Sequence, residues 1–482
     1  MANLSSLFKD TAIYGLSSIV GRFLNYLLVP LYSYKMQAAS GDYGIVTNIY
    51  SIVALLLVIL TFGMETTFFR FVNKDSERPQ RVYSTTLYAV TAVALLFVGV
   101  VLAGLSLFAG WLGYAGAPQY VAVMAVVVAL DAIQCIPFAY LRYQRRPMRF
   151  ASLKLLFVFL NILLNLAYFL GVENPSVGAV FYINLFCTSF IMLFFWRELA
   201  AGYRFAPDRA LLGRMLSYTW PILILGIAGI LNQTADKILY PGVRGGHEGR
   251  VELGIYGACV KVAMIMAMIT QAFRYAYEPF VFAGSGGKDN RAVYAKAMKY
   301  FLIFTLLAFL IVIGYLDILK YMVARDYWEG LGVIPIVMVA EIMMGIYFNL
   351  SFWYKLTDKT FWGAVFSGAG CAVLVAVNIA FIPHFHYMAC AWAGVAGYGT
   401  AMLLSYFVGQ KYYPIAYPLR SMAVYVLLAA FLFVLMQLLP ATWPLWARLA
   451  INTLLILAFA GHILYHDVPL SRLPVVGKYF KG

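Results

Sequence analysis

Ionisable side chains inside long apolar segments are the residues of this sequence most able to bind or move a charged ligand. The basic members of this set are Arg22, Lys237, Lys261 and Arg274, and the acidic members are Asp131, Asp236 and Glu341. An ionisable group that faces lipid near the bilayer centre costs about 2.5 kcal/mol or more, so each should face a pocket or a partner. The surplus of cations predicts a cavity for an anion, and arginine suits phosphate in particular.

Helical spacing places several of these residues on shared faces with other polar side chains. In the segment 254–280 one face carries Lys261, Met264, Met268, Gln271, Tyr275 and Glu278, and in 150–171 another carries Lys154, Asn161, Asn165 and Tyr168. Shorter pairs are Arg22 with Asn25, and Asn232 with Asp236. Residues three, four and seven positions apart share a helix face. Polar stripes on otherwise apolar helices predict the walls of a water-filled cavity.

The candidates for contacting a ligand in this cavity are Arg22, Asn25, Lys154, Asn161, Lys261, Gln271 and Arg274. Other interpretations stay open. Four side chains close to helix ends can instead snorkel or form local ion pairs: Glu65, Lys154, Arg274 and Glu278. Structural pairs are also open for Arg22 with Asp131, for Lys261 with a neighbouring carboxylate, and for Asp236 with Lys237. Asparagine and tyrosine often serve only hydrogen bonds between helices.

Motifs of enzyme active sites are not recognisable in the sequence. Residues 284–289 read GSGGKD, which lacks the spacing and the final hydroxyl of a phosphate-binding loop. His462 and His466 are four positions apart without the glutamate of a zinc helix, and His384 and His386 form the other histidine pair. The five cysteines are scattered singly, as expected for small apolar residues. We therefore predict a protein that is not an enzyme, has no cofactor or metal, and draws on an ion gradient, the membrane potential or the substrate gradient.

The chain that must position these residues is built almost entirely from apolar segments. Hydrophobic residues make up 63% of the 482 positions and charged residues 11%, against roughly 45 to 50% and about 25% in a soluble domain. Segments of about 20 residues cross ~30 Å of hydrocarbon as helices, because lipid offers no partner to an open backbone. The sequence predicts an all-α polytopic membrane protein with about fourteen helices, near 11–34, 43–69, 82–109, 119–141, 150–171, 176–196, 216–240, 254–280, 292–316, 331–354, 361–383, 387–409, 418–439 and 446–466.

The net charge of +15 is explained by membrane topology rather than by nucleic acid. With these helices, one set of alternate connections holds 22 lysines and arginines and the opposite set holds 5. The positive-inside rule then places both termini in the cytoplasm, which requires an even number of helices. The polar lead Met1–Asp10 has no basic region followed by a cleavable apolar core, so no signal peptide is expected.

An internal repeat is indicated by two pairs of residues. Tyr43-Gly44 opens the second helix with Glu65 22 positions after the tyrosine, and Tyr256-Gly257 opens the eighth with Glu278 22 positions after its tyrosine. The offset of 213 residues corresponds to six helices, so both copies have the same membrane orientation. We expect an N-lobe at 1–205 with helices 1–6, a C-lobe at 206–415 with helices 7–12, and helices 13 and 14 with a cytoplasmic tail at 416–482.

A resemblance to a known transporter family covers essentially the whole chain, and its loose motifs lie between Pro30 and Lys261. They are Pro30-Leu31-Tyr32, Asp42-Tyr43-Gly44, Phe62-Gly63-Met64-Glu65 with Arg70-Phe71, Asp236-Lys237, and Gly254-Ile255-Tyr256-Gly257 with Lys261. The sequence resembles the polysaccharide-biosynthesis (Wzx-type) flippases of the multidrug/oligosaccharidyl-lipid/polysaccharide (MOP) exporter superfamily. The resemblance implies two six-helix lobes around a central cavity, two further helices, and alternating access.

The substrate implied by the resemblance is an undecaprenyl-pyrophosphate-linked oligosaccharide, such as an O-antigen or other surface polysaccharide repeat unit. It would move from the cytoplasmic to the periplasmic leaflet of a bacterial inner membrane. Arg22, Lys261 and Arg274 would contact the pyrophosphate, and tyrosines and asparagines of the stripes the sugars. The partners implied are this substrate and membrane lipids, with polysaccharide polymerase and ligase machinery, and we expect a monomer that binds no nucleic acid.

An ion site and three rival functions complete the expectations. The related lipid II flippases use a sodium site in the second lobe, which Asp236, Asn378 and Thr400 match loosely, although a second carboxylate is absent from the eleventh helix. Asp131 and Glu341 are alternative sites for proton coupling, so Na+ or H+ is the expected coupling ion. The alternatives in the same superfamily are a lipid II flippase and a cation-coupled drug antiporter. A membrane glycosyltransferase or polymerase is the alternative from another class.

Overall fold

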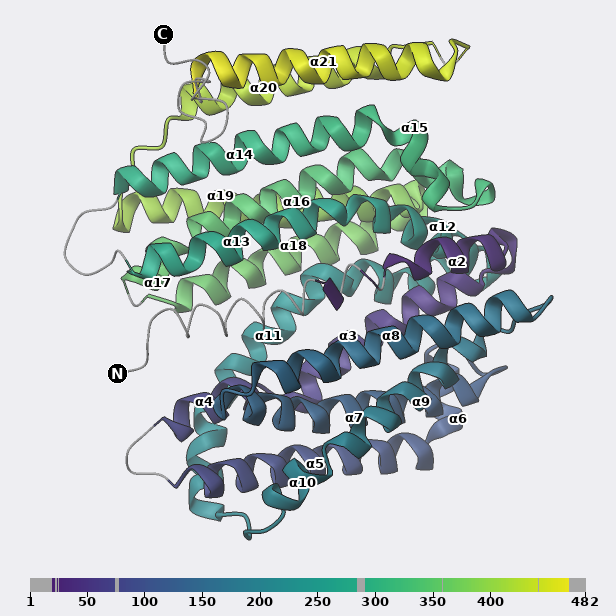
Figure 1. Cartoon of the computed structure of the whole chain (residues 1–482), viewed down its shortest axis with the longest axis vertical. Coiled ribbons are helices and arrows are strands. Elements are labelled where there is room, and N and C mark those ends of the chain that lie inside the picture. Colours follow the sequence, from purple (N-terminus) through teal and green to yellow (C-terminus); the bar gives the residue numbers. More distant parts are fainter. Residues whose placement is uncertain are drawn as a thin grey trace. The chain divides into compact units, whose positions relative to one another are not determined.

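The computed structural model describes residues 20, 21, 24, 26–73, 78–283, 291–357, 359–440 and 442–467, without the side chains of 275–283. In these ranges the chain is helical and contains no strand (Figure 1). The α-helices, which Figure 1 labels, are α2 (Leu28–Lys35), α3 (Asp42–Thr61), α4 (Met64–Val72), α5 (Pro79–Ala103), α6 (Leu105–Trp111), α7 (Pro118–Tyr143), α8 (Pro147–Gly171), α9 (Gly178–Phe194), α10 (Trp196–Gly202), α11 (Arg209–Arg244), α12 (Gly246–Ala263), α13 (Ile265–Ala283), α14 (Arg291–Gly314), α15 (Leu316–Leu319), α16 (Val333–Leu350), α17 (Phe352–Leu356), α18 (Phe361–Phe385), α19 (Tyr387–Tyr412), α20 (Leu419–Gln437) and α21 (Leu445–His466).

The predicted all-α membrane fold is confirmed. Within the described ranges, eleven helices are long and apolar enough to cross a membrane, and the number is thirteen if each of two bent pairs counts as one span. The bends are 65° between α9 and α10, and 42° between α12 and the part of α13 up to Arg274. Half of the first expected helix, 11–34, lies outside the described residues, so the count of fourteen stays a prediction.

Two compact units make up the structure. The first contains the described residues of Met1–Ala258 together with Ser367–Gly397, and the second contains those of Cys259–Phe366 together with Tyr398–Gly482. We call them unit 1 and unit 2 and describe each by itself. The two lobes and the C-terminal pair expected from the repeat stay a prediction.

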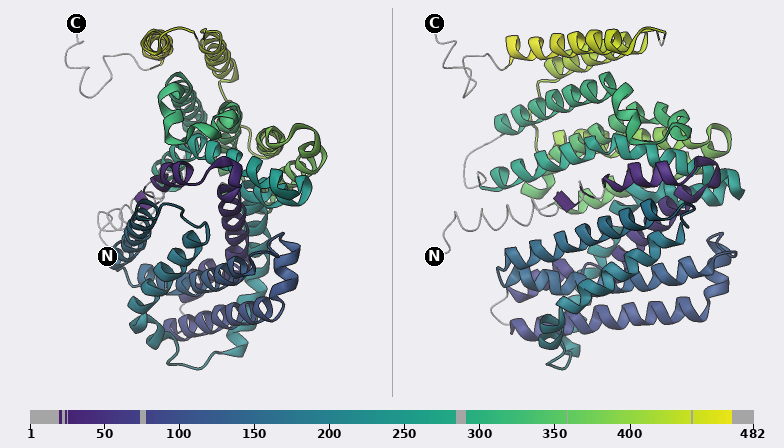
Figure 2. Two further views of the ribbon diagram at one scale, coloured as in Figure 1. Left: turned by 90° about the vertical axis from the view of Figure 1, so that its right-hand side faces the viewer. Right: turned by 45° about the vertical axis from the view of Figure 1, so that its right-hand side comes forward.

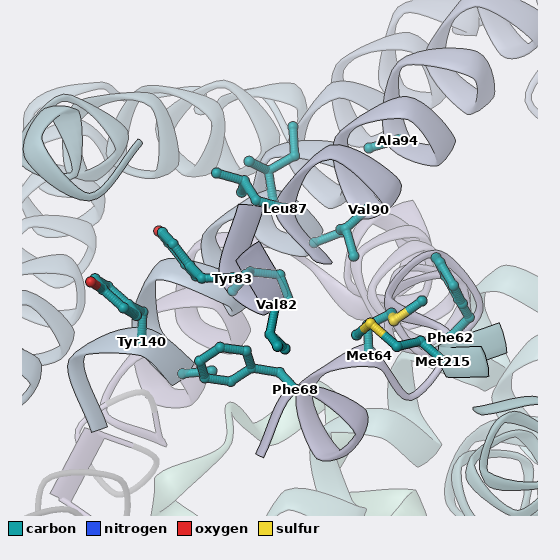
Figure 3. Packing of buried hydrophobic residues seen from close by; sticks show 14 of the residues in the cluster. Phe62, Met64, Phe68, Val82, Tyr83, Leu87, Val90, Ala94, Tyr140 and Met215 are labelled. Carbon is teal, nitrogen blue, oxygen red and sulfur yellow. The ribbon is translucent and has the colours of Figure 1, made fainter. Parts of the chain in front are cut away.

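The core of unit 1 is apolar and aromatic. Phe62, Met64 and Phe68 from the end of α3 and from α4 pack with side chains of α5, α7 and α11 (Figure 3). Tyr83 of α5 stacks on Tyr140 of α7 with ring centroids 3.9 Å apart. Since lipid is as apolar as leucine, helices in a membrane gain stability from such close packing rather than from exclusion of water. This core holds α4 and α7 together, and both carry charged residues.

A break between α3 and α4 divides the single helix expected at 43–69. Phe62 and Gly63 both have positive φ, 32° and 73°. A Cβ atom at Gly63 would lie 2.9 Å from Cγ2 of Ile222 on α11, so the close approach of α11 also requires glycine here. The break places Glu65 in the first turn of α4, where a carboxylate interacts favourably with the helix dipole.

Unit 2 joins its last two helices to α14. In Figure 2 the pair α20 and α21, coloured olive to yellow, lies along α14. At one end of this group Lys299 of α14 forms an ion pair with Asp467, which also accepts a hydrogen bond from Tyr425 of α20. At the other end Asn452 of α21 donates to the carbonyl oxygen of Gly314 at 2.8 Å. An ion pair and hydrogen bonds thus hold the helix pair to α14 at both ends.

Candidate functional site

A charged cluster in unit 1 begins with an ion pair between Glu65 of α4 and Arg142 of α7. Their side chains are 38% and 31% exposed. The thiol of Cys135, two turns before Arg142 on α7, donates to the second oxygen of Glu65 at 3.0 Å. Both carboxylate oxygens of Glu65 are therefore held by α7. The sequence analysis assigned Arg142 to a loop, so this pair was missed, and only the local-pair interpretation of Glu65 pointed to it.

Lys154 of α8 extends the same cluster. Its side chain is exposed, and its Nζ lies 4.1 Å from the ring centroid of Phe138 on α7. It interacts electrostatically with the carboxylates of Asp131 and Glu65. A ring face attracts an ammonium group, which offsets part of the cost of bringing the charge into an apolar segment. The structure therefore brings Lys154 and Asp131 together, two of the residues singled out from the sequence.

Asp131 of α7 is linked to α9 and α3 through hydroxyl and amide groups. Thr188 of α9 donates to Asp131 at 3.4 Å and to Asn184 at 3.2 Å. Asn184 in turn donates to the hydroxyl oxygen of Tyr50 on α3 at 2.7 Å. Polar side chains thus connect a half-buried carboxylate to two neighbouring helices, which would couple a change of its charge to their packing. The pairing of Asp131 with Arg22 stays untested, because Arg22 and Asn25 lie outside the described residues.

The second half of the polar stripe on α8, with Asn161 and Asn165, faces other helices. Asn161 and Asn165 are buried, at 8% and 0% exposed. Asn165 accepts a hydrogen bond from the hydroxyl of Tyr32 on α2 at 2.8 Å and donates to the carbonyl oxygen of Asn161. These contacts match the helix-to-helix interpretation of asparagine. In unit 1 the exposed polar member of this face is Lys154.

A second charged cluster in unit 1 surrounds Asp236 of α11. Both of its carboxylate oxygens accept hydrogen bonds from Lys237, at 2.8 and 3.0 Å. The hydroxyl of Tyr256 on α12 donates to Asp236 at 2.7 Å. Asn232, one turn earlier, donates to the carbonyl oxygen of Ser367 on α18 at 3.1 Å. The pairing of Asp236 with Lys237 considered from the sequence is present in this structure.

Glu252 of α12 is the centre of a third cluster, which the sequence analysis missed. It accepts hydrogen bonds from Tyr240 and Arg244 of α11. His386, in the connection from α18 to α19, places its Nδ1 2.9 Å from Glu252 and has a positive φ of 53°. The histidine pairs of the sequence were weighed only as metal ligands. No group of three metal-ligating side chains occurs among the described residues.

The candidate residues of unit 2 lie on α12, α13, α16 and α19. Lys261 on α12 is exposed, whereas Gln271 and Arg274 on α13, Glu341 on α16 and Thr400 on α19 are half-buried. The guanidinium of Arg274 lies 4.9 Å from the ring centroid of Phe348 on α16. Arg274 lines a small pocket with aromatic walls, together with Thr270 and Asn349.

The stripe expected on a continuous helix 254–280 is interrupted. The helix ends at Ala263 and resumes at Ile265, and the two parts are bent by 42°. Lys261 therefore belongs to α12 and Gln271 with Arg274 to α13. Nothing in the local sequence, neither proline nor glycine, accounts for the break. The side chains of Tyr275 and Glu278 lie outside the description.

Comparisons with known proteins agree with this architecture. Residues 7–276 match the family described as "Polysaccharide biosynthesis protein". No curated protein sequence gives a significant match. The structure of a lipid II flippase, MurJ, in an inward closed conformation is similar with a TM-score of 0.74 at 13% identity, covering 94% of this chain and 98% of that one.

Multidrug transporters are similar over a smaller part of the chain. An inward-facing MATE family transporter of the MOP superfamily has a TM-score of 0.62 at 14% identity, covering 83% of this chain and 94% of that one. The MATE multidrug transporter DinF-BH, solved as a complex, has a TM-score of 0.59 at 14% identity, with coverage of 84% and 95%. At these identities the likeness shows the fold. The chain therefore belongs to the polysaccharide biosynthesis protein family and has the fold of the MOP transporters.

Proposed function

We propose that this protein is a flippase that moves an undecaprenyl-pyrophosphate-linked oligosaccharide across the bacterial inner membrane by alternating access. The substrate would be a repeat unit of O-antigen or of another surface polysaccharide. The family membership and the transporter fold support a flippase. In our proposal both termini are cytoplasmic, the protein acts as a monomer, and polymerase and ligase machinery use its product.

The observation that carries the proposal is the exposure of two lysines in otherwise apolar spans. Lys154 on α8 and Lys261 on α12 both have exposed side chains. In hydrocarbon such a side chain costs about 2.5 kcal/mol or more, so each should face water or an anion rather than lipid. A pyrophosphate group is an anion that charge-assisted hydrogen bonds from lysine and arginine can hold. The two lysines therefore support an anionic substrate over a cationic one.

The proposed contacts are those expected from the sequence and from the family resemblance. Arg22, Lys261 and Arg274 would bind the pyrophosphate, and Lys154, Gln271 and Asn25 would be further contacts to the substrate. Asn161 is buried between helices and is the weakest member of the set. Ion coupling, with Na+ or H+ as the ion, would use Asp131 or Glu341. In the third expected set, Asp236 with Asn378 and Thr400, the carboxylate is already paired with Lys237.

The test is leaflet-resolved transport of lipid-linked oligosaccharide in proteoliposomes, with and without ion gradients. We expect Lys154→Ala and Lys261→Ala each to lower the initial rate about tenfold or more, which corresponds to ~1.4 kcal/mol. Lys296→Ala, at an exposed lysine near the start of α14, is the control and should keep the rate. Wild-type rates from both Arg22→Ala and Lys261→Ala would contradict the anion cavity.

A lipid II flippase is the second candidate, because the MurJ structure covers nearly the whole chain. Offering lipid II and a lipid-linked oligosaccharide to the same proteoliposomes separates the two, since the faster substrate identifies the function. A drug antiporter, as the MATE likeness allows, should instead transport an organic cation and lose activity on neutralisation of Asp131 or Glu341.

A further inference from the structure

The ammonium group of Lys237 is surrounded by the oxygens that an inorganic cation would use. Its Nζ lies 2.8 and 3.0 Å from the two carboxylate oxygens of Asp236 and 3.1 Å from the carbonyl oxygen of Gln233. An ammonium group has three hydrogens to donate, so these three oxygens satisfy all of them. The ammonium group of Lys237 therefore makes all of its hydrogen bonds to oxygens within a single turn of α11.

The pair is withdrawn from solvent and supported from α12. The side chains of Lys237 and Asp236 are 17% and 10% exposed. The hydroxyl of Tyr256 donates to Asp236, and the ring centroid of Tyr256 lies 5.5 Å from Nζ of Lys237. Removing one partner of such a pair leaves a buried charge without its counter-ion, which is strongly unfavourable. A vacated Asp236 should accordingly attract another cation.

The neighbouring helices fix this turn of α11 in place. Asn48 of α3 donates to the carbonyl oxygen of Lys237 at 2.8 Å. On the other side, Asn232 donates to the carbonyl oxygen of Ser367 on α18. This turn of α11 is thus held by contacts with α3 and α18, and Tyr256 of α12 holds the carboxylate of Asp236. The pair is therefore enclosed by other helices.

A sodium ion at Asp236 does not fit this arrangement. Carboxylate and backbone carbonyl oxygens are suitable ligands for a hard cation, but at Asp236 they are already engaged by the lysine. Asn378 of α18 has a buried Oδ1 without a hydrogen-bond partner in the described part of the chain, which would suit a cation. Its amide nitrogen donates to the carbonyl oxygen of Leu374. The charged member of the expected sodium set nevertheless holds a counter-ion from its own chain.

We propose that Lys237 is a tethered substitute for a coupling cation at Asp236, so that this carboxylate takes no Na+ from solution while the lysine is present. The positive charge required there is supplied by the residue next in the chain. Transport then does not depend on Na+ binding at Asp236. The inference rests on the proposed function only in its statement about transport, because the cation site itself is a property of the folded chain.

The test compares thermal unfolding of the full-length protein in detergent, in NaCl and in choline chloride at equal ionic strength. Wild type should give the same Tm in both salts. Lys237→Ala should have a Tm about 2 to 4 °C higher in NaCl, because a ligand that binds only the folded state raises its stability. Lys237→Gln, which is closer in size, provides a second neutral variant if the alanine protein is not recovered.

Two controls assign the effect to Asp236. Asp236→Asn combined with Lys237→Ala should lose the difference between the salts. Lys320→Ala removes a lysine that pairs with Asp317 at 2.9 Å with similar exposure, 22% against 17% for Lys237, and should behave as wild type. A sodium-specific rise in wild type that Asp236→Asn removes would overturn the proposal. So would Lys237 variants that fold and show no response to sodium.

The transport measurement separates this inference from the proposed function. Wild type should move lipid-linked oligosaccharide at equal rates in NaCl and choline chloride. If the wild-type rate falls when Na+ is replaced by choline, while the rate of Asp236→Asn does not fall on the same replacement, the assignment of Lys237 as a tethered cation is overturned. The proposed flippase function would still stand. Failure to move any lipid-linked oligosaccharide would contradict the proposed function, while the unfolding measurements would still decide the cation site.

Discussion

Gly44 of α3 lies against the backbone of Arg250 on α12 with no space for a side chain. A Cβ atom at Gly44 would be 1.9 Å from the carbonyl oxygen of Arg250. Gly254 and Gly257 of α12 continue the contact, since a Cβ at Gly257 would lie 2.5 Å from Oγ1 of Thr47. Small residues that let helix backbones approach are characteristic of helix packing in membranes. The two Tyr-Gly motifs from which the sequence predicts a repeat therefore lie at one helix crossing.

Gly44→Ala should destabilise this crossing, because the obstructing atoms belong to backbone and cannot rotate away. We expect a loss of about 1 to 3 kcal/mol, as for overpacking of a core, seen as a lower Tm in detergent. Gly99→Ala on α5 is the matched control, since no atom lies within 4 Å of its Cβ position. Equal Tm values for the two variants would show that the crossing tolerates a methyl group.

The ion pair of Glu65 and Arg142 should couple α4 to α7. Both side chains are partly exposed, which limits the expected interaction energy to about 1 kcal/mol. In a double-mutant cycle, Glu65→Gln and Arg142→Gln should each lower the Tm, and the double variant should lose less than the sum. Strict additivity of the two losses would mean that the pair contributes no coupling.

The carboxyl group of Asp467 should make the free energy of unfolding depend on pH under acidic conditions. Burial opposes its ionisation, but the hydrogen bonds from Lys299 and Tyr425 outweigh this and hold the pKa of Asp467 below its ordinary value. Because the unfolded chain binds this proton more readily, the stabilisation is complete above the ordinary aspartate pKa of about 3.9 and is lost as the pH falls through the folded-state value.

Thermal unfolding between pH 6 and pH 3 checks this linkage. Asp467→Asn should lower the Tm at pH 6 and flatten its fall towards pH 3 relative to wild type. Glu173→Gln, at an exposed carboxyl in the loop after α8, is the control. A wild-type slope in Asp467→Asn would exclude this carboxyl as the source.

Asn452 of α21 should stabilise the contact between α21 and the C-terminal end of α14. The last carbonyl groups of a helix lack partners within it, and Asn452 supplies one to Gly314. Asn452→Leu should cost about 1 to 3 kcal/mol through the unsatisfied carbonyl, measured as a lower Tm. Asn73→Leu removes a similar bond to the carbonyl of Phe69 at an exposed position and should have little effect.

The sequence by itself determined the class of fold and the family. Apolar segments long enough to cross a bilayer must be helical, because no other open structure satisfies their backbone in lipid. The expected helices 119–141 and 446–466 therefore agree with α7 and α21, whereas the expected helices 43–69 and 254–280 are each interrupted. Rare charged residues in such segments also identified Lys154, Asp131 and Asp236 as members of polar clusters.

Tertiary structure alone decided which partners these residues have. Glu65 pairs with Arg142, 77 positions away, and His386 with Glu252, 134 positions away, because helix packing brings together residues that no sequence period relates. The breaks after Thr61 and Ala263 likewise appeared only in the fold, since the sequence predicted one continuous helix over each of 43–69 and 254–280. Adjacency in sequence suggested the pair of Asp236 and Lys237, but only the folded arrangement shows Gln233 and Tyr256 completing it.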